Sequence, residues 1–177
     1  MPTVVTHQER SHTVLPIVQT AVVPTPIGDL TLVSNGAALV EIRLPAPSTP
    51  LPRRPVTSGA DDKDEVIAQA SRQLAEYFRG ERQVFDLPLA PHGTSFQLAV
   101  WDALAQVPYG QTVSYGELAD QAGRPGCARA VGSAMAANPL AVVLPCHRVV
   151  GSDGRLTGFG GGLHRKRFLL ELESPHD

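Results

Sequence analysis

The sequence predicts an α+β fold: a small N-terminal antiparallel sheet with a helix, followed by a helical C-terminal domain that contains a helix-turn-helix. Alternating strands with an Asn35-Gly36 turn occupy the first third of the chain. Helical periodicity dominates the second half, where a glycine-containing turn joins two short helices. With 177 residues, 42% of them hydrophobic, the chain can form one domain of ordinary size or two small ones that share an interface.

The N-terminal domain is expected to span residues 20–90, after a flexible leader at residues 1–19. Alternation predicts strands at 21–23, 30–33 and 39–44, paired as an antiparallel meander. Five prolines between residues 45 and 63 predict a mobile loop, because proline has no amide hydrogen to give to a helix or a ladder. A helix is expected over 64–78, ending at Gly80, and a short strand over 84–87. Residues 88–93 form a connector and the expected domain boundary.

The C-terminal domain is expected to span residues 91–177. Its first helix begins at Thr94 or Ser95. Ser114 and Glu117 form a capping box for a second helix over 115–122, and a third covers 127–137. These last two helices make the helix-turn-helix. An apolar stretch at 140–150, a Gly-rich loop at 151–162 and an amphipathic helix from 163 to about 173 complete the chain.

Charge is nearly balanced along the chain, at a net −2, which excludes a uniformly basic nucleic-acid coat. The distribution is uneven, however. Residues 121–170 carry seven basic side chains against Asp153 alone, a local +6, while the rest of the chain sums to −8. A basic end of this kind favours an anionic partner.

The location of the protein is expected to be cytoplasmic, in a bacterial cell. No apolar run reaches the length of a membrane span, so no membrane partner is expected. The N-terminus lacks the basic and apolar segments of a secretory signal. The two cysteines, Cys127 and Cys146, are therefore expected to stay reduced.

Cys146 is the candidate nucleophile of the sequence. His147 offers a base, and Arg148 with the local positive charge favours a thiolate. Adjacent strand residues point to opposite faces, but Pro145 favours an irregular backbone that could bring the two side chains together. The alternative, a cysteine buried among valines as a small hydrophobe, stays open at this point.

The third helix, residues 127–137, consists mostly of small residues with Arg129 near its start. It lacks the several Arg, Asn or Gln side chains that a major-groove reader carries, and it suits close approach to a minor groove with one inserted cation. Tight packing in a core is the alternative. The Gly158–Gly162 run precedes basic residues 165–167, so a phosphate nest and a plain flexible loop are both open.

Together, these segments resemble the O6-alkylguanine-DNA alkyltransferase family. The resemblance rests on five segments: Pro145-Cys146-His147-Arg148-Val149-Val150-Gly151, Ala128-Arg129-Ala130-Val131-Gly132, Asn138-Pro139, Val107-Pro108-Tyr109-Gly110 with Ser114-Tyr115, and Gly158-Phe159-Gly160-Gly161-Gly162. It is dense from about residue 94 to 173 and looser from 21 to 87. It implies a DNA repair protein with a ribonuclease-H-like N-terminal domain.

By this resemblance, the protein flips O6-alkylguanine, and O4-alkylthymine, out of duplex DNA and moves the alkyl group irreversibly to Cys146, once per molecule. His147 would remove the thiol proton through a water, Glu173 would orient His147, and Tyr115 would turn the nucleotide and protonate the departing guanine. Arg129 would fill the gap in the base stack. The implied DNA-binding residues are Tyr115, Ala128, Arg129, Ser133, Met135 and Ala136. The implied pocket and support residues are Asn138, Pro145, Arg148, Val149, Phe159, Gly160 and Lys166.

The resemblance implies no cofactor, and a monomer for which cooperative binding to DNA is an open alternative. No metal is expected, because the zinc-binding residues that some family members carry near their start have no match in this sequence. Two residues depart from the family pattern: Phe159 stands where a Tyr is common, and Cys127 has no family role. Three other functions are weighed against alkyl transfer. A lesion sensor would lack the cysteine, a helix-turn-helix regulator would need more base-reading side chains, and a Cys-His thiol hydrolase would leave the DNA-facing features unexplained.

Overall fold

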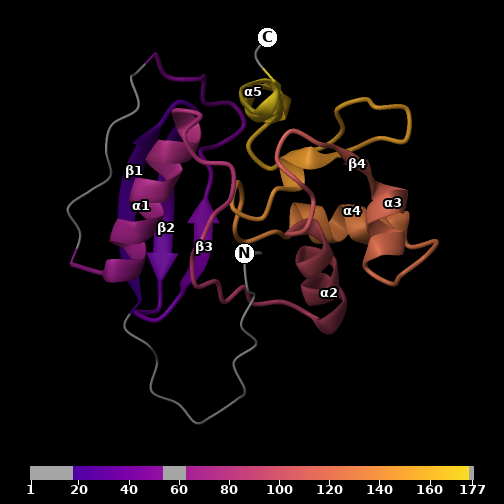
Figure 1. Cartoon of the computed structure of the whole chain (residues 1–177), viewed down its shortest axis with the longest axis horizontal. Coiled ribbons are helices and arrows are strands. Elements are labelled where there is room, and N and C mark those ends of the chain that lie inside the picture. Colours follow the sequence, from indigo (N-terminus) through magenta and orange to yellow (C-terminus); the bar gives the residue numbers. More distant parts are fainter. Residues whose placement is uncertain (1–17, 54–62, 176–177) are drawn as a thin grey trace.

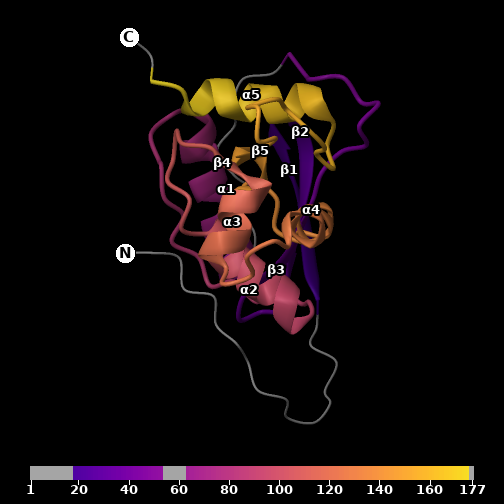
Figure 2. The same ribbon diagram turned by 90° about the vertical axis from the view of Figure 1, so that its right-hand side faces the viewer.

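The computed structural model describes residues 18–53 and 63–175. It has two halves, a sheet half (residues 18–53 and 63–90) and a helical half (residues 91–162), with the last helix, α5 (Leu163–Glu173), lying over both (Figure 1). Figure 2 shows α5 lengthwise across one end of the molecule. The α+β fold class is confirmed. None of the helices in the described ranges is long and apolar enough to cross a membrane.

The sheet half contains a three-stranded antiparallel sheet in the order β1-β2-β3. Its strands are β1 (Gln19–Thr25), β2 (Gly28–Ser34) and β3 (Leu39–Arg43). The Thr25 hydroxyl closes the first turn, because it accepts from the Ile27 amide and donates to the Gly28 carbonyl. Asn35 closes the second turn by accepting from two backbone amides with its side-chain oxygen. The predicted meander is therefore present.

Helix α1 (Glu65–Phe78) packs on the sheet through the apolar stripe that its periodicity predicts. Asp64 caps its start by accepting from the Ile67 amide at 3.0 Å. The strand predicted at 84–87 is wrong. The side chain of Gln73 binds both the amide and the carbonyl of Asp86 at 2.8 Å, so these groups are not free for a ladder. Leu89 instead makes an isolated bridge to Leu39.

The helical half begins with α2 (Ser95–Leu104), followed by α3 (Tyr115–Gln121) and α4 (Ala128–Ala136). Capping boxes start α2 and α3, the second of them the predicted pair of Ser114 and Glu117. Gly123 and Gly126, with φ of +70° and +77°, form the turn of the helix-turn-helix, a backbone region in which other residues are strained. Trp101 fastens α2 to α4 by donating to the Ala134 carbonyl at 2.9 Å.

The apolar stretch at 140–150 folds into a turn, a single 3₁₀ turn and a short strand. The 3₁₀ turn, η1, is Cys146–Arg148, and β5 (Val149–Val150) follows it directly. β5 pairs in parallel with β4 (Val113–Ser114), which leads straight into α3. This two-rung ladder was not predicted, because each strand is too short to show a period in the sequence.

Helix α5 differs from the predicted amphipathic helix, since its buried face carries charged residues. Arg165 and Lys166 have no exposed surface, and Glu173 is 2% exposed. The Arg165 guanidinium donates to the carbonyls of Ile27, Thr49 and Gly161 at 2.5, 2.9 and 2.8 Å. One buried cation therefore joins the sheet half to the Gly-rich loop.

The Pro-rich loop and the leader are described only in part. Residues 45–53 contain neither helix nor strand, as predicted, but they are fastened to Arg165 through the carbonyls of Ala46 and Thr49. Residues 54–62 of the loop and residues 1–17 of the leader lie outside the described residues. The predicted leader, residues 1–19, extends one residue too far, because β1 begins at Gln19.

Candidate active site

A cavity of about 300 Å³ opens beside Cys146, between α4 and the Gly-rich loop. Its walls come from α4, from the first residue of α3 and from the loop that precedes α5. The lining residues are Tyr115, Gly132, Met135, Ala136, Cys146, Gly158, Phe159 and Gly160. The pocket therefore unites the candidate nucleophile with seven further residues of the helix-turn-helix and the Gly-rich loop.

Two lining residues, Gly132 and Gly158, were not among the predicted site residues. A Cβ at Gly132 would lie 3.9 Å from the ring of Tyr115, so the glycine leaves the pocket wall open beside that ring. Gly158 belongs to the Gly-rich run, which could have indicated it. Val149, which was expected to line the pocket, does not. Its side chain is completely buried, and its carbonyl accepts from the Lys166 ammonium at 2.5 Å.

Lys166 binds the backbone of the loop that lines the pocket. Besides Val149, its ammonium donates to the carbonyls of Thr157 at 2.8 Å and of Gly158 at 3.3 Å. Burial lowers the pKa of Lys166, and the Cys146 thiol opposes this shift. The predicted supporting role of Lys166 therefore corresponds to three backbone contacts that fix the loop around the cavity.

Asn138 connects the end of α4 to the turn that precedes the cysteine. Its side-chain amide donates to the Leu144 carbonyl at 2.9 Å, and its side-chain oxygen accepts from the Leu140 amide at 2.9 Å. Pro145 is buried, and its carbonyl accepts from the Arg148 amide to close the 3₁₀ turn. The irregular backbone expected at Pro145 is therefore this turn, and it leaves Cys146 half-buried and His147 completely buried.

The Cys146 thiol lies in an environment that favours its neutral form. Burial raises its pKa, while the Asn138 side chain, the Lys166 charge and nearby backbone amides only partly oppose that shift. The expectation that the basic surroundings favour a thiolate is wrong for the free protein. Arg148 binds Glu173, and Arg165 binds backbone carbonyls, so neither cation is directed at the sulfur.

Glu173 is the centre of a buried hydrogen-bond network. Its Oε1 lies 2.7 Å from His147 Nε2 and 2.9 Å from Arg148 Nη2, and its Oε2 accepts from Arg148 Nε at 2.8 Å and from the Gly110 amide at 3.3 Å. Burial alone would raise the pKa of Glu173, but the bonds from His147 and Arg148 outweigh it and hold that pKa well below its usual range. Glu173 is therefore ionised at neutral pH.

The fifth donor to Glu173 is Tyr77 on α1, whose hydroxyl lies 2.6 Å from Oε1. This residue was missed as a member of the site. Helical periodicity marks Tyr77 only as a core position, and nothing in the local sequence indicates which group its hydroxyl binds. Arg148 also donates to the Val107 carbonyl at 2.6 Å, so it supports the site rather than lining the pocket.

The orientation of His147 leaves one ring nitrogen available for chemistry. Nε2 faces the ionised carboxylate and therefore carries the hydrogen, so Nδ1 has the lone pair. Nδ1 is buried and has no hydrogen-bond partner among the described residues. Burial lowers the pKa of His147, and the nearby cations Arg148 and Lys166 act in the same direction against Glu173. The imidazole is therefore a neutral base at pH 7.

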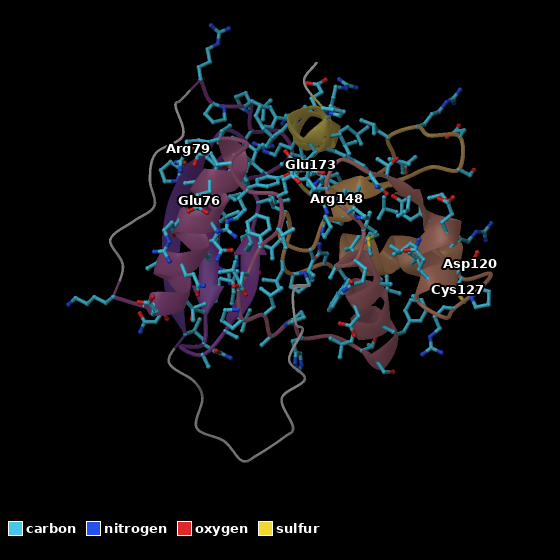
Figure 3. The ribbon with its side chains drawn as sticks, in the orientation of Figure 1. Glu76, Arg79, Asp120, Cys127, Arg148 and Glu173 are labelled. Carbon is cyan, nitrogen blue, oxygen red and sulfur yellow. The ribbon has the colours of Figure 1, made fainter. Side chains whose placement is uncertain are left out.

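The predicted DNA-binding residues occupy α4 and the start of α3. Arg129, Ser133 and Ala136 are exposed, Ala128 and Tyr115 are half-buried, and Met135 is buried against the cavity. Figure 3 shows Arg148 beside Glu173, the last residue of α5, with Cys127 far from both at the distant end of the helix-turn-helix. Cys127 therefore belongs to the turn before α4 and not to the site. Within the described residues, no group of three or more His, Cys, Asp or Glu side chains could hold a metal ion.

Two family models match the chain and together cover most of it. The ribonuclease-like domain of 6-O-methylguanine DNA methyltransferase matches residues 18–91, and the DNA-binding domain of the same family matches residues 95–175.

Named relatives agree with this match. The methylated-DNA–protein-cysteine methyltransferase of Mycobacterium bovis is 50% identical over 151 residues, which are 85% of this chain and 89% of the relative. The protein of the same name from Methanosarcina acetivorans is 53% identical over 112 residues, 63% of this chain and 72% of the relative.

Solved structures show the same architecture. The O6-methylguanine methyltransferase of Mycobacterium tuberculosis superposes with a TM-score of 0.74 at 45% identity, covering 91% of this chain and 97% of that one. A complex of the Mycobacterium tuberculosis protein with DNA gives a TM-score of 0.75 at 48% identity, covering 86% and 90%. With both family models and these relatives in agreement, the chain belongs to the 6-O-methylguanine DNA methyltransferase family.

Proposed function

We propose that this protein repairs DNA by moving an alkyl group from O6-alkylguanine, and from O4-alkylthymine, in duplex DNA to Cys146. The observation that carries the proposal is the position of Cys146 in the wall of a 300 Å³ cavity, directly before a buried histidine oriented by a carboxylate. The DNA-binding family model over residues 95–175 supports DNA as the partner. The chemistry needs no cofactor.

The proposed reaction begins with proton removal. His147 Nδ1 takes the thiol proton of Cys146 through an intervening water, because Nε2 is held by Glu173. The sulfur then attacks the alkyl carbon in line with the bond to O6. The S–C bond forms, the C–O6 bond breaks with its electron pair going to guanine, and the Tyr115 hydroxyl protonates the departing oxygen. The proton on His147 then returns through solvent to the Tyr115 phenolate, so both residues end in their starting protonation states.

Single turnover follows from the product. A thioether on Cys146 is stable, and the site holds no group that could displace the alkyl carbon again. Keeping the thiol neutral until the base is bound also protects it, since a neutral thiol reacts slowly with other electrophiles. Each molecule would therefore repair one lesion.

The proposed DNA surface is the exposed face of α4 with the start of α3 and the pocket loop. Not all of the basic segment is available to phosphates. Arg148, Arg165 and Lys166 are buried structural cations, so they do not face the solvent where phosphates would lie. The exposed cations of the segment are Arg124, Arg129, Arg155 and Arg167, and Arg155 pairs with Asp153 at 3.2 Å. The electrostatic part of binding should be modest.

The base pocket would be closed on one side by the Phe159 ring, which replaces a tyrosine common at this position. The ring can still stack on a flipped base, while the hydroxyl contact is lost. We further propose that the protein acts as a cytoplasmic monomer. The domain division at residues 88–93 is likewise proposed.

The test is alkylation of the intact protein by duplex DNA that contains O6-methylguanine. The Cys146 peptide should gain about 14 Da, the mass of one methylene group. Cys146→Ser should lose the transfer and still bind duplex DNA, because the hydroxyl is a poor nucleophile at an unchanged surface. Cys127→Ser is the matched control and should react at the wild-type rate. Alkylation of Cys127 in the Cys146→Ser protein would contradict the proposal.

A further inference from the structure

We infer that Tyr77, on α1 of the sheet half, is a positioning residue that tunes the His147–Glu173 pair and sets the pH range of alkyl transfer. The inference deepens the proposed function and rests on it, because it assumes that His147 activates Cys146. It assigns to the sheet half a direct part in the chemistry of a site otherwise built from the helical half and α5.

The geometry places Tyr77 on the same carboxylate oxygen as His147. The Tyr77 hydroxyl donates to Glu173 Oε1 at 2.6 Å, and His147 Nε2 lies 2.7 Å from that atom. Arg148 Nη2 is the third donor to it, at 2.9 Å. Three donors share the negative charge of this one oxygen, so each hydrogen bond to it weakens the other two.

The Tyr77 ring is fixed in place by aromatic packing. Tyr77 is completely buried, and its ring centroid lies 5.2 Å from that of Phe78, 5.3 Å from Phe85 and 6.2 Å from Tyr109. The hydroxyl therefore reaches Glu173 without a loss of rotamer freedom at the time of reaction. A side chain serving only as core would need the ring and not the hydroxyl.

The hydroxyl remains a donor at every pH at which the protein would work. Burial raises the pKa of Tyr77 well above its ordinary value, and the charge and hydrogen bond of Glu173 raise it further against the opposing charge of Arg148. A permanent donor on Oε1 withdraws charge from the atom that would otherwise stabilise an imidazolium on His147. Tyr77 therefore helps to keep His147 neutral, which is the form that can accept the thiol proton.

Other titratable or charged groups lie near the pair, and the variants used below leave every charged one of them unchanged. They come from η1, from α5 and from the segment after α2, and they are Cys146, Arg148, Lys166 and Tyr109. Among the groups that titrate or carry charge near the pair, Tyr77 is the one supplied by α1. Its removal changes a single hydrogen bond and leaves Glu173 with four other donors.

Tyr109 offers a matched control. It belongs to the same aromatic cluster, and its hydroxyl donates to the Leu172 backbone carbonyl at 3.2 Å rather than to the Glu173 carboxylate. Tyr109→Phe and Tyr77→Phe therefore each delete one phenol oxygen from one cluster. They differ in whether the lost bond ends on Glu173.

The experiment measures the single-turnover rate of transfer from duplex O6-methylguanine to the full-length protein between about pH 5 and about pH 9. The rate falls on the acid side of its pH profile as His147 becomes protonated, and we call this fall the acid limb. In Tyr77→Phe the acid limb should move to higher pH by roughly half a unit to one unit, because His147 binds its proton more tightly. The rate near pH 6 should fall roughly three- to tenfold, and the deficit should narrow above about pH 8. Tyr109→Phe should keep the wild-type limb.

A second variant should shift the acid limb in the opposite direction while keeping the hydrogen bond between residue 77 and Glu173. Incorporation of 3-fluorotyrosine at position 77 makes the phenol a stronger donor, so the acid limb should move to lower pH. Titration of the His147 ring by NMR should follow the same order in the three proteins. A merely structural hydroxyl would lower the melting temperature or slow the reaction equally at every pH.

The inference is overturned if neither Tyr77 variant moves the acid limb, or if Tyr77→Phe slows transfer uniformly across the pH range. In either case Cys146 is still alkylated, so the proposed function stands without it. If the wild-type protein leaves Cys146 unmodified by duplex O6-methylguanine, the proposed function fails and the inference falls with it.

Discussion

The phenol oxygen of Tyr115 lies 3.2 Å from the carbonyl oxygen of Thr157 and 3.1 Å from the Thr157 hydroxyl. The phenol donates to the carbonyl and accepts from the hydroxyl, and the same carbonyl accepts from the Lys166 ammonium at 2.8 Å. The proton proposed for the leaving group is therefore held at the edge of the pocket before any base enters. The oxygen of a flipped base would take the place of the Thr157 carbonyl as acceptor and so receive the phenol proton.

Tyr115→Phe should slow alkyl transfer by roughly a hundredfold or more, because a general acid contributes about that much to a step with a poor leaving group. Stopped-flow or quench measurements on duplex O6-methylguanine would give the rate. Thr157→Val is the companion variant. It keeps the Tyr115 phenol and its carbonyl acceptor and removes only the Thr157 hydroxyl. The rate of alkyl transfer should therefore fall less than in Tyr115→Phe. A wild-type rate for Tyr115→Phe would remove the residue from the mechanism.

Arg129→Ala should impair transfer from duplex DNA far more than reaction with a free O6-alkylguanine base. Arg129 is exposed near the start of α4, where the proposed role is to occupy the space left by the flipped nucleotide. The free base needs no flipping, so its reaction provides the internal control. Equal slowing of both reactions would place Arg129 in the fold or the pocket.

Salt should weaken DNA binding only moderately. Four exposed cations remain in the basic segment, and each neutralised phosphate contributes about −0.9 to the log–log slope of affinity against salt. A slope no steeper than about −4 is therefore expected for Cys146→Ser with undamaged duplex. A steeper slope would mean that cations outside residues 121–170 also contact DNA.

The Cys146 thiol of the free protein should react slowly with iodoacetamide at neutral pH. Burial raises its pKa, so the thiolate forms only as the pH rises beyond the usual cysteine range of about 8.5. The measurement uses Cys127→Ser, so that Cys146 is the only thiol, and compares it with the same protein in denaturant. A midpoint below that of the denatured protein would show that the site stabilises the thiolate before substrate binds.

Glu173 should make the fold sensitive to acid. The folded-state pKa of Glu173 lies well below the ordinary 4.5, so its ionised form stabilises the fold at neutral pH. That contribution is lost as the pH falls below about 4.5 toward the folded-state pKa, where the unfolded chain takes up the proton and the folded chain does not.

Glu173→Gln should therefore lower the free energy of unfolding by about 3 kcal/mol at pH 7, because it leaves Arg148 buried without its charged partner. The same variant should show a flatter decline of stability between about pH 5 and about pH 3. Urea unfolding at several pH values measures both effects. The prediction fails if the wild type and the variant decline in parallel.

Much of the architecture could be predicted from the sequence, because its signals are local. The strands, the capping boxes and the glycine turn of the helix-turn-helix each depend on a few neighbouring residues. The pairing of Cys146 with His147 also lies within one motif, and Pro145 correctly indicated an irregular backbone there.

The missed features depend on contacts between distant segments. Tyr77 and Glu173 are 96 positions apart, and no periodicity in α1 indicates what the hydroxyl binds. Arg165 suggested a basic surface by its type, and only the fold supplies the carbonyls that bury it. Likewise, the strand expected at 84–87 was prevented by Gln73, whose amide binds the backbone of Asp86.

The parallel ladder of β4 and β5 has a mechanical consequence for repair. Val113 pairs with Val149 and Ser114 with Val150, so backbone pairing joins the residue before Tyr115 to the strand that follows the Cys146–Arg148 turn. When the helix-turn-helix contacts an uneven or bent duplex, this pairing would keep the proposed acid and the proposed nucleophile together. The alkyl group would then meet the same spacing between sulfur and phenol on every stretch of DNA, whatever its local shape.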